Sequence, residues 1–489
     1  MQKFLSIVAC MLLAFYSRSQ SLQFIVHPDT SVHTALSGRL YIFSQPDTTR
    51  GVGDPDPFNP SPTFYRDVQN WQPGQLQVID SAAPAWIKMR DMKPGFYKFS
   101  TVFDVNTEER SLQSPGNRFS RKDVVVEVKK DAATEEVHLY LNGVFRERKF
   151  NESDSIKEVK LKSAVLSAFH KKDIFLKAAI VLPRNYAANS TKEYPLVCII
   201  PGWGGTHWDA TQPYPAQRYG FGMGKEKIYL YLNPDTQSPF GLHAFVDSRV
   251  NGPWGKALVE ELIPYLCNTY RIQKNPLHHF MVGQSTGGYG SLWLQLNYPK
   301  AFGGCWAVSP DPVDFSDFTS VNIYTPNNNI YYTTDHKERP FFLWEGKFVS
   351  TLKAFMQFEA FMGDGGQMQA FEAEFGIPGK DGRPLEAFNR ETGSIDAKVA
   401  QAWKPYDMGL YIQQHWKKLA KDLQHKVHIY AGADDNFYLD RAVMRLKEKA
   451  QKVNADVVAE LIPNANHFTI WSPVFTQRVQ QEIDALIKE

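Results

Sequence analysis

The sequence contains few cysteines and no spacing that would bind a metal ion. Four cysteines stand in 489 residues, too few for the disulfide framework of a small exported domain. Cys198 and Cys305 lie in apolar runs and Cys267 lies in a helical pattern, so we expect buried free thiols. The thirteen histidines form no zinc-type cluster. The sequence therefore predicts neither a metal site nor a cofactor.

The sequence also has no excess of charge of one sign. The formal net charge is +2 at pH 7 and the basic residues form no run, so the signature of a nucleic-acid-binding protein is missing. Beyond the N-terminus, no apolar stretch approaches the ~20 residues that a membrane-spanning helix needs. We therefore expect a soluble mature protein without a nucleic-acid partner. Nothing in the sequence indicates an oligomeric state.

The first 19 residues have the pattern of a secretory signal peptide. A short positive start at 1–3 precedes an almost wholly apolar run at 4–15, and small residues follow where a signal peptidase cuts. We therefore expect a secreted or periplasmic protein. Residues 7–10 resemble a lipoprotein cleavage site. However, the apolar run continues beyond Cys10, so we do not expect a lipid anchor.

Residues 20–155 have the pattern of an all-β domain. Short β-rich runs occupy 40–43, 97–103, 123–128 and 137–141, and turn-rich segments with proline and glycine separate them. Strands without intervening helices predict a β-sandwich of the immunoglobulin-like kind. Loop acids such as Asp54 fit solvated turns better than a cation site. We expect an accessory domain.

From residue 156 to 489 the pattern changes to strands that alternate with helices. Eight β-rich runs stand at 159–161, 174–182, 196–200, 228–232, 280–282, 305–308, 427–430 and 457–461, and helical patterns at 255–270, 287–296, 439–453 and 475–487 separate most of the later ones. This order predicts an α/β fold with a mostly parallel, doubly wound, eight-stranded sheet. Residues 312–425 interrupt the alternation, and we interpret them as a lid-like insertion after the sixth strand.

A Gly-x-Ser-x-Gly motif stands between the fifth predicted strand and the helix that follows it. It reads Gly-Gln-Ser-Thr-Gly at 283–287. A tight strand-to-helix turn lifts the hydroxyl of Ser285 clear of the sheet, and the flanking glycines leave room where side chains would clash. A glycine-rich turn whose serine has no catalytic role would have the same sequence pattern. The strand before the motif and the helix after it favour a nucleophile.

A serine nucleophile needs a base, and the base needs an acid that orients it. His467 follows the eighth strand, and Asp434 and Asp435 follow the seventh. The order Ser, Asp, His, with each residue beyond the carboxyl end of a strand, is the one expected on such a sheet. His467 is therefore the candidate base. Asp435 and Asp434 compete as the acid, and Asp311, after the sixth strand, is a third candidate.

An oxyanion hole needs two backbone N–H groups near the nucleophile. One is expected from Thr286, the residue after Ser285. The other is expected from the glycine-rich loop at 201–205 after the third strand, which contains Trp203. Aromatic residues gather on the loops around this edge, and their faces suit sugar rings as well as aryl groups. We name Trp203 and Trp254 as candidate substrate-binding residues.

Six short motifs carry a family resemblance. They are Pro-Gly-Trp-Gly-Gly at 201–205, Asn-Gly-Pro-Trp-Gly at 251–255, Gly-Gln-Ser-Thr-Gly-Gly at 283–288, Ser-Pro-Asp-Pro at 309–312, Gly-Ala-Asp-Asp-Asn-Phe-Tyr at 432–438 and Asn-His-Phe at 466–468. With them the chain from about residue 156 to 489 resembles the α/β-hydrolase superfamily, and within it the esterase group that includes esterase D, the feruloyl esterases and the enterochelin esterases. The resemblance implies Ser285 as nucleophile, Asp435 as acid and His467 as base. Gln284 and Pro201 stand where that group usually has histidine.

These observations predict an exported serine hydrolase that cleaves carboxylic esters through a covalent acyl-enzyme, without a cofactor. The substrate stays open between an acylated carbohydrate and an aryl ester. A serine peptidase on the same sheet is one alternative. A binding protein that has kept the fold without the activity is the other.

Overall fold

The computed structural model describes residues 22–29, 33–129, 133–186 and 191–487, and the chain divides into two compact units. The first unit comprises Met1–Asp56, Pro60–Asn106 and Leu112–Arg146, and the second comprises Pro57–Asn59, Thr107–Ser111 and Glu147–Glu489. The expected signal peptide at 1–19 lies outside the described residues. Two short segments that we expected in the all-β region thus belong to the second unit.

The first unit consists of two β-sheets. One has the strand order β4-β1-β8, with β1 (Leu22–His27), β4 (Gln77–Ile79) and β8 (Glu135–Tyr140). The other has the order β3-β2-β5-β6-β9 with β7 beside β5, formed by β2 (Leu36–Gln45), β3 (Thr63–Trp71), β5 (Gly95–Asp104), β6 (Arg118–Phe119), β7 (Val124–Val128) and β9 (Gly143–Val144). Strand β1 buries every second residue, as a strand with one face on a core does. The rings of Phe24, Phe64 and Phe99 meet in that core.

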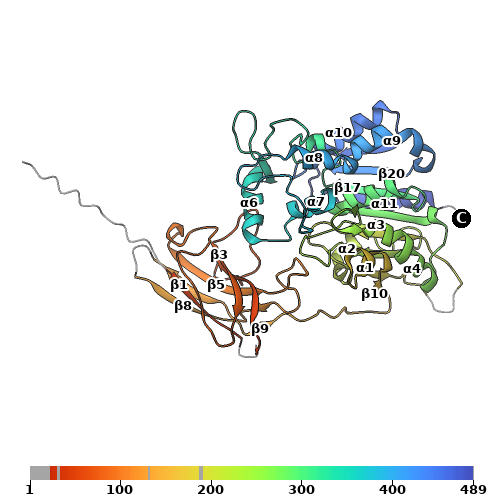
Figure 1. Ribbon diagram of the computed structural model, residues 1–489. Coiled ribbons are helices and arrows are strands. Elements are labelled where there is room, and N and C mark those ends of the chain that lie inside the picture. Colours follow the sequence, from red (N-terminus) through yellow and green to blue (C-terminus); the bar gives the residue numbers. More distant parts are fainter. Residues whose placement is uncertain (1–21, 30–32, 130–132, 187–190, 488–489) are drawn as a thin grey trace, which may run out of the picture. The chain divides into compact units, whose positions relative to one another are not determined.

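An eight-stranded sheet is the centre of the second unit (Figure 1). In spatial order its strands are β10 (Ile156–Lys162), β11 (Phe175–Val181), β13 (Ile228–Leu232), β12 (Leu196–Ile200), β16 (His279–Ser285), β17 (Gly304–Pro310), β20 (Val427–Gly432) and β21 (Val457–Ile462). Each of the eight predicted runs forms one of these strands. The six strands from β13 to β21 are parallel, but β11 runs antiparallel to both of its neighbours. The sheet is therefore mixed, and the prediction of a mostly parallel sheet holds only for that six-stranded part.

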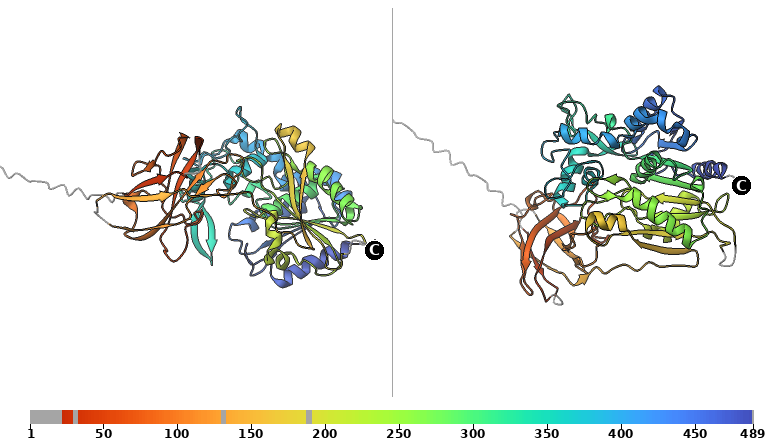
Figure 2. Two further views of the ribbon diagram at one scale, coloured as in Figure 1. Left: turned by 90° about the horizontal axis from the view of Figure 1, so that it is seen from below. Right: turned by 45° about the vertical axis from the view of Figure 1, so that its right-hand side comes forward.

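Helices cover both faces of this sheet (Figure 2). Alternate residues of a strand point to opposite faces, so the sheet has two cores. One core combines residues such as Met281 with side chains of α5 (Thr286–Asn297) and α10 (Leu439–Lys452). The other combines residues such as Val282 with side chains of α2 (Pro213–Tyr219) and α11 (Pro473–Leu486). The unit also contains α1 (Ala164–His170), α3 (Trp254–Ala257), the π-helical turn η3 (Leu258–Leu262), α4 (Ile263–Thr269), β14 (Asp247–Ser248) and β15 (Gly252–Pro253).

The chain between β17 and β20, which we call the insertion, has a fold of its own. It contains β18 (Pro340–Trp344), β19 (Lys347–Thr351), α6 (Leu352–Met362), α7 (Gln367–Phe375), α8 (Ala397–Ala402) and α9 (Met408–Leu423). Buried aromatic rings pack inside it: the ring centroid of Trp403 lies 5.3 Å from that of Phe375 and 5.6 Å from that of Phe388. The same residues continue into one of the two cores of the sheet. The insertion is therefore packed as part of the second unit.

Candidate active site

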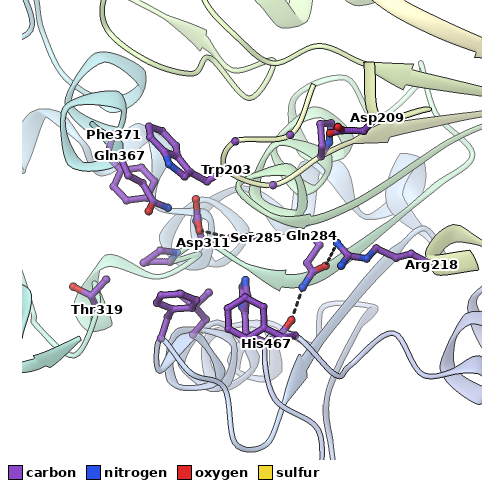
Figure 3. Close-up of a pocket in the computed structure, with 18 of the residues that line it drawn as sticks. Trp203, Asp209, Arg218, Gln284, Ser285, Asp311, Thr319, Gln367, Phe371 and His467 are labelled. Atoms are coloured by element: carbon purple, nitrogen blue, oxygen red, sulfur yellow. Dashed lines mark hydrogen bonds between the residues drawn. The ribbon is translucent and has the colours of Figure 1, made fainter. Parts of the chain in front are cut away.

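A cavity of about 630 Å³ lies at the carboxyl ends of the parallel strands, the edge at which open α/β sheets bind their ligands. Figure 3 shows most of its lining side chains. The aromatic lining residues are Phe58, Trp203, Tyr214, Tyr219, Tyr231, Phe341, Phe371, Phe437 and Phe468, and the polar ones are Asp209, Arg218, Gln284, Ser285, Asp311, Thr319, Gln367 and His467. The cavity is thus an aromatic pocket whose polar groups include the predicted serine and histidine.

Ser285 stands on a strained turn between β16 and α5. Its backbone has φ 56° and ψ −125°, a conformation that a residue with a side chain adopts only where its surroundings impose it. A Cβ on Gly283 would lie 2.1 Å from the carbonyl oxygen of Gly287, and a Cβ on Gly287 would lie 1.9 Å from that of Ile200. The two glycines of the motif are therefore a steric requirement of the turn that presents the serine to the cavity.

His467 and Asp435 form a buried pair at the next two strand ends. His467 follows β21 and Asp435 follows β20, and Nδ1 of the imidazole lies 3.0 Å from Oδ2 of the carboxylate. Burial acts to raise the pKa of Asp435. However, the charge and hydrogen bond of His467, together with the N–H of Phe437, outweigh burial and hold that pKa below its ordinary value. An ionised Asp435 therefore fixes which nitrogen of His467 carries the proton.

The structure separates the two adjacent aspartates. Asp434 is exposed, whereas Asp435 is buried. The next residue, Asn436, accepts a hydrogen bond from the backbone N–H of His467 at 3.1 Å and donates to the carbonyl of Leu343 in β18 at 2.6 Å. The side-chain amide of Asn436 thus links the loop that carries Asp435 to His467 and to strand β18 of the insertion. Nothing in the sequence pattern had marked Asn436.

Gln284 forms the other support of the histidine loop. Its amide nitrogen donates to the carbonyl of His467, and its amide oxygen accepts from the guanidinium of Arg218 at 3.1 Å (Figure 3). Gln284 therefore joins the turn of Ser285 to the loop of His467.

Asp311, the third predicted acid, accepts a hydrogen bond from Ser285, whereas His467 bonds to Asp435. The Ser285 hydroxyl donates to Oδ1 of Asp311 at 3.2 Å (Figure 3). The Thr286 hydroxyl donates to Oδ2 at 2.6 Å. Burial raises the pKa of Asp311 to about 6, although these hydrogen bonds and the nearby His467 act to lower it. The side chain bonded to His467 is thus that of Asp435. Asp311 instead accepts the hydrogen bond of the Ser285 hydroxyl.

The glycine-rich loop after β12 comes close to Ser285. A Cβ on Gly202 would lie 3.2 Å from Cβ of Ser285, and the loop closes on itself through a hydrogen bond from the N–H of Gly205 to the carbonyl of Gly202 at 3.0 Å. Trp203 lies in this loop and lines the cavity. Thr286 is the first residue of α5, where backbone N–H groups have no partner inside the helix. Both predicted oxyanion residues therefore flank Ser285.

Trp254, predicted to bind substrate, does not line the cavity. Its indole is 2% exposed, stacks on His243 at a centroid distance of 3.6 Å and donates to the carbonyl of Asn251 at 2.8 Å. We expected it on a loop near the site. However, α3 begins at Trp254 and turns its side chain into the core. That correction leaves Trp203 as the predicted tryptophan in the cavity.

The described part of the chain contains no group of three or more His, Cys, Asp or Glu side chains arranged to hold a metal ion. Cys198 and Cys305 are buried free thiols, as predicted, and Cys267 is free and partly buried. Within the same described ranges, no helix combines the length and the apolar character that crossing a membrane requires.

Comparison with known proteins gives a family. The family model described as "Putative esterase" matches residues 175–480, and no curated protein matches the chain. Similar solved structures include a ferulic acid esterase (14% identity, 68% of this chain and 98% of the other, TM-score 0.42) and an S-formylglutathione hydrolase from Agrobacterium tumefaciens (14%, 69% and 98%, 0.41). A third is the Staphylococcus aureus fluorophosphonate-binding serine hydrolase F (12%, 68% and 99%, 0.40).

Proposed function

Because the chain belongs to the esterase family whose model matches residues 175–480, it is a carboxylic ester hydrolase, and we propose that it acts as a serine esterase. In this proposal Ser285 is the nucleophile, His467 the base and Asp435 the orienting acid. The supporting observation is their arrangement. Ser285 and His467 line one cavity, Ser285 on a strained turn, and the ionised Asp435 holds Nδ1 of His467.

The reaction begins when Oγ of Ser285 attacks the carbonyl carbon of a bound ester. The hydroxyl proton passes to Nε2 of His467, so the serine turns its hydroxyl away from Asp311 and toward the imidazole. Asp435 stabilises the imidazolium that forms. The backbone N–H groups of Trp203 and Thr286 bind the oxyanion of the tetrahedral intermediate.

The intermediate then breaks its bond to the alcohol. The leaving alcohol takes the proton from His467, and the acyl group stays on Ser285 as an ester. A water molecule attacks the carbonyl carbon of this acyl-enzyme while His467 removes a proton from the water. The bond between the acyl carbon and Oγ then breaks, Oγ takes the proton back from His467, and the carboxylic acid leaves. The groups named for each step all belong to this chain.

The aromatic lining supports an aryl ester or an acylated carbohydrate as the substrate, because aromatic faces pack on both kinds of ring. The pattern of the first 19 residues supports export to the periplasm or the outside of the cell. We also propose that the first unit is an immunoglobulin-like accessory sandwich, on the basis of its two sheets, of which the larger pairs its strands antiparallel throughout. The balanced charge gives no reason to expect a nucleic-acid partner.

A fluorophosphonate probe tests the proposal directly, because it forms a stable bond only with an activated serine. We expect the full chain to be labelled and to hydrolyse a short aryl ester. Ser285→Ala should abolish labelling and lower kcat by at least about three powers of ten. Ser291→Ala is the matched control, since Ser291 is a buried serine of α5 whose hydroxyl donates to the carbonyl of Gly287. A Ser285→Ala chain that keeps its turnover would refute the triad, and hydrolysis of peptides in preference to esters would identify a peptidase.

A further inference from the structure

Two short segments far upstream in the sequence are part of the catalytic unit. Pro57–Asn59 and Thr107–Ser111 cluster with residues from Glu147 onward. Each brings one large side chain to the candidate active site: Phe58 lines the cavity, and Arg110 contacts Trp203. The mechanism above assigns neither residue a role.

Phe58 packs against aromatic rings on the His467 side of the cavity. Its ring stacks on Phe342 and Phe355 of the insertion at centroid distances of 4.4 and 5.4 Å, and lies 5.8 Å from Phe437. Phe437 in turn meets the imidazole of His467 edge-on at 4.9 Å. Phe58 therefore contacts both the insertion and the acid loop, and its partly buried ring forms part of the wall that a substrate meets.

Arg110 contacts the glycine-rich loop at 201–205 through Trp203. Its guanidinium carbon is 4.8 Å from the ring centroid of Trp203, and its Nε donates to Oδ1 of Asp235 at 2.8 Å. The Arg110 side chain is only 17% exposed, so the contact with the indole is largely shielded from water, where a cation–π contact is strongest. Asp235, on the loop after β13, accepts this hydrogen bond and so orients the guanidinium against the indole of Trp203, the residue to which the proposed mechanism assigns an oxyanion-binding N–H.

We propose that these two residues complete the ester-binding cavity, Phe58 as a specificity-determining residue in its wall and Arg110 as a positioning residue for the oxyanion loop. The proposal rests on the esterase mechanism given above. It assigns the two residues different effects: the loss of a wall residue changes how well large substrates bind, and the loss of a positioning residue behind an oxyanion donor changes the rate of the chemical step.

Full-length Phe58→Ala and Phe58→Leu test the wall. We expect kcat/KM for an aryl-acyl ester to fall on the order of tenfold relative to an acetyl ester in Phe58→Ala, through KM, because contact with a large acyl group is lost and a small one never reached the ring. Phe58→Leu, which keeps an apolar side chain and guards against misfolding, should lie between. Phe96→Ala is the control, since Phe96 in β5 is 57% exposed. An unchanged ranking of the two esters in both variants would overturn the role of Phe58.

Full-length Arg110→Ala tests the positioning role. We expect kcat to fall on the order of tenfold for both esters while KM stays within about twofold, because the oxyanion donor loses its support in the transition state. Arg110→Lys, which keeps the charge beside Asp235, should recover part of the loss. Arg121→Ala is the matched control, an exposed arginine beside the ring of Phe119. A rise in KM alone, or no change, would overturn this role.

Fluorophosphonate labelling separates the failure of this proposal from the failure of the esterase mechanism. If the parent chain is not labelled at Ser285, the mechanism itself is wrong. If the parent and all variants are labelled, the cavity is competent, and the ester ranking of the Phe58 variants and the kcat of the Arg110 variants decide the proposal alone.

Discussion

The strand ends and the insertion build one cavity by different means. Ser285, Asp435 and His467 each stand just beyond a parallel strand, so the pairing of β16, β17, β20 and β21 brings them to the same edge of the sheet. Their positions follow from the topology. Short connections leave them little freedom, and buried hydrogen bonds such as the one between His467 and Asp435 remove what is left.

The insertion forms part of the cavity wall and contributes no group that reacts in the proposed mechanism. Thr319, Phe341, Gln367 and Phe371 line the cavity, and none of them is placed in the proposed mechanism. Their positions depend on side-chain packing inside the insertion, for example on the buried pair between Glu372 of α7 and Arg390 at 2.6 Å. The comparison teaches that the chemistry stands on the sheet, whereas the size and shape of the pocket depend on chain packed against it.

The largest effect should come from the acid at the strand end. Asp435→Asn should lower kcat by about three to four powers of ten, because an amide can no longer select the tautomer of His467 or stabilise its charged form. Asp434→Asn should stay within about twofold, since Asp434 is exposed and a surface change away from such contacts has little effect. Steady-state rates on one aryl ester, with circular dichroism as the folding control, measure both. Equal losses in the two variants would mean that topology does not single out Asp435.

Much of the sheet edge could be predicted from the sequence, because strand–turn–helix order and strand ends leave a readable pattern. The eight runs, the turn at Ser285 and the loops of Asp435 and His467 follow from it. The strand pattern left Asp434 and Asp435 open and only the family resemblance favoured Asp435, since two adjacent residues point in opposite directions and only the backbone path decides which one is buried. The inward rotation of Trp254 has the same origin.

The walls could not be predicted, because they depend on contacts between residues distant in sequence. Phe58 lies almost four hundred positions before Phe437, and no periodicity links them. The roles of Asn436 and Gln284 could not be predicted from the sequence pattern either, because each side-chain amide forms hydrogen bonds to two segments distant in sequence. The sequence pattern predicts helices and strands, whereas the contacts between residues distant in sequence follow only from the packing of the folded chain.

An intermediate effect should appear at Asp311, where the sheet ends and the insertion begins. Burial raises its pKa to about 6 from an ordinary value of 3.8, so the folded chain keeps a proton that the unfolded chain releases between these values. The associated stability is present below about pH 4 and is lost as the pH rises through about 6. At about 1.4 kcal/mol per pH unit, the loss in the parent chain is about 3 kcal/mol by pH 7.

Asp311→Asn has no such titration. We therefore expect the free energy of unfolding of this variant, relative to the parent, to rise by about 3 kcal/mol between pH 4 and pH 7. The carboxyl group of Glu374 in α7 should likewise make the parent chain less stable as the pH rises, because burial and then the charge of Asp311 raise its pKa. Urea unfolding at a series of pH values measures the difference, with the exposed Asp434→Asn as control. Parallel pH profiles of variant and parent would show that Asp311 is not buried beside Ser285 as described.

The smallest effect should come from the insertion, at Phe371 of α7. Its ring lines the cavity, is 4% exposed and stacks with Phe375 at 5.7 Å. Phe371→Leu should shift the ratio of kcat/KM between a bulky and a small acyl ester by up to about tenfold, because it changes the volume of the wall and touches no reacting group. Phe348→Ala is the control from the same insertion, 57% exposed and outside the cavity.

Phe371→Leu is preferable to a deletion, since shortening the chain from Gly363 to Gly382 would remove α7 and its buried residues altogether. It is also preferable to Phe371→Ala, because emptying a buried aromatic site costs about 3–5 kcal/mol and would confuse specificity with stability. If kcat/KM falls by one common factor for every ester, the insertion supports the sheet without setting the size of the pocket. In that case Phe371 does not determine which esters the cavity prefers, and specificity cannot be assigned to this part of the insertion. A changed ranking with unchanged kcat for the small ester places specificity in the insertion and chemistry at the strand ends.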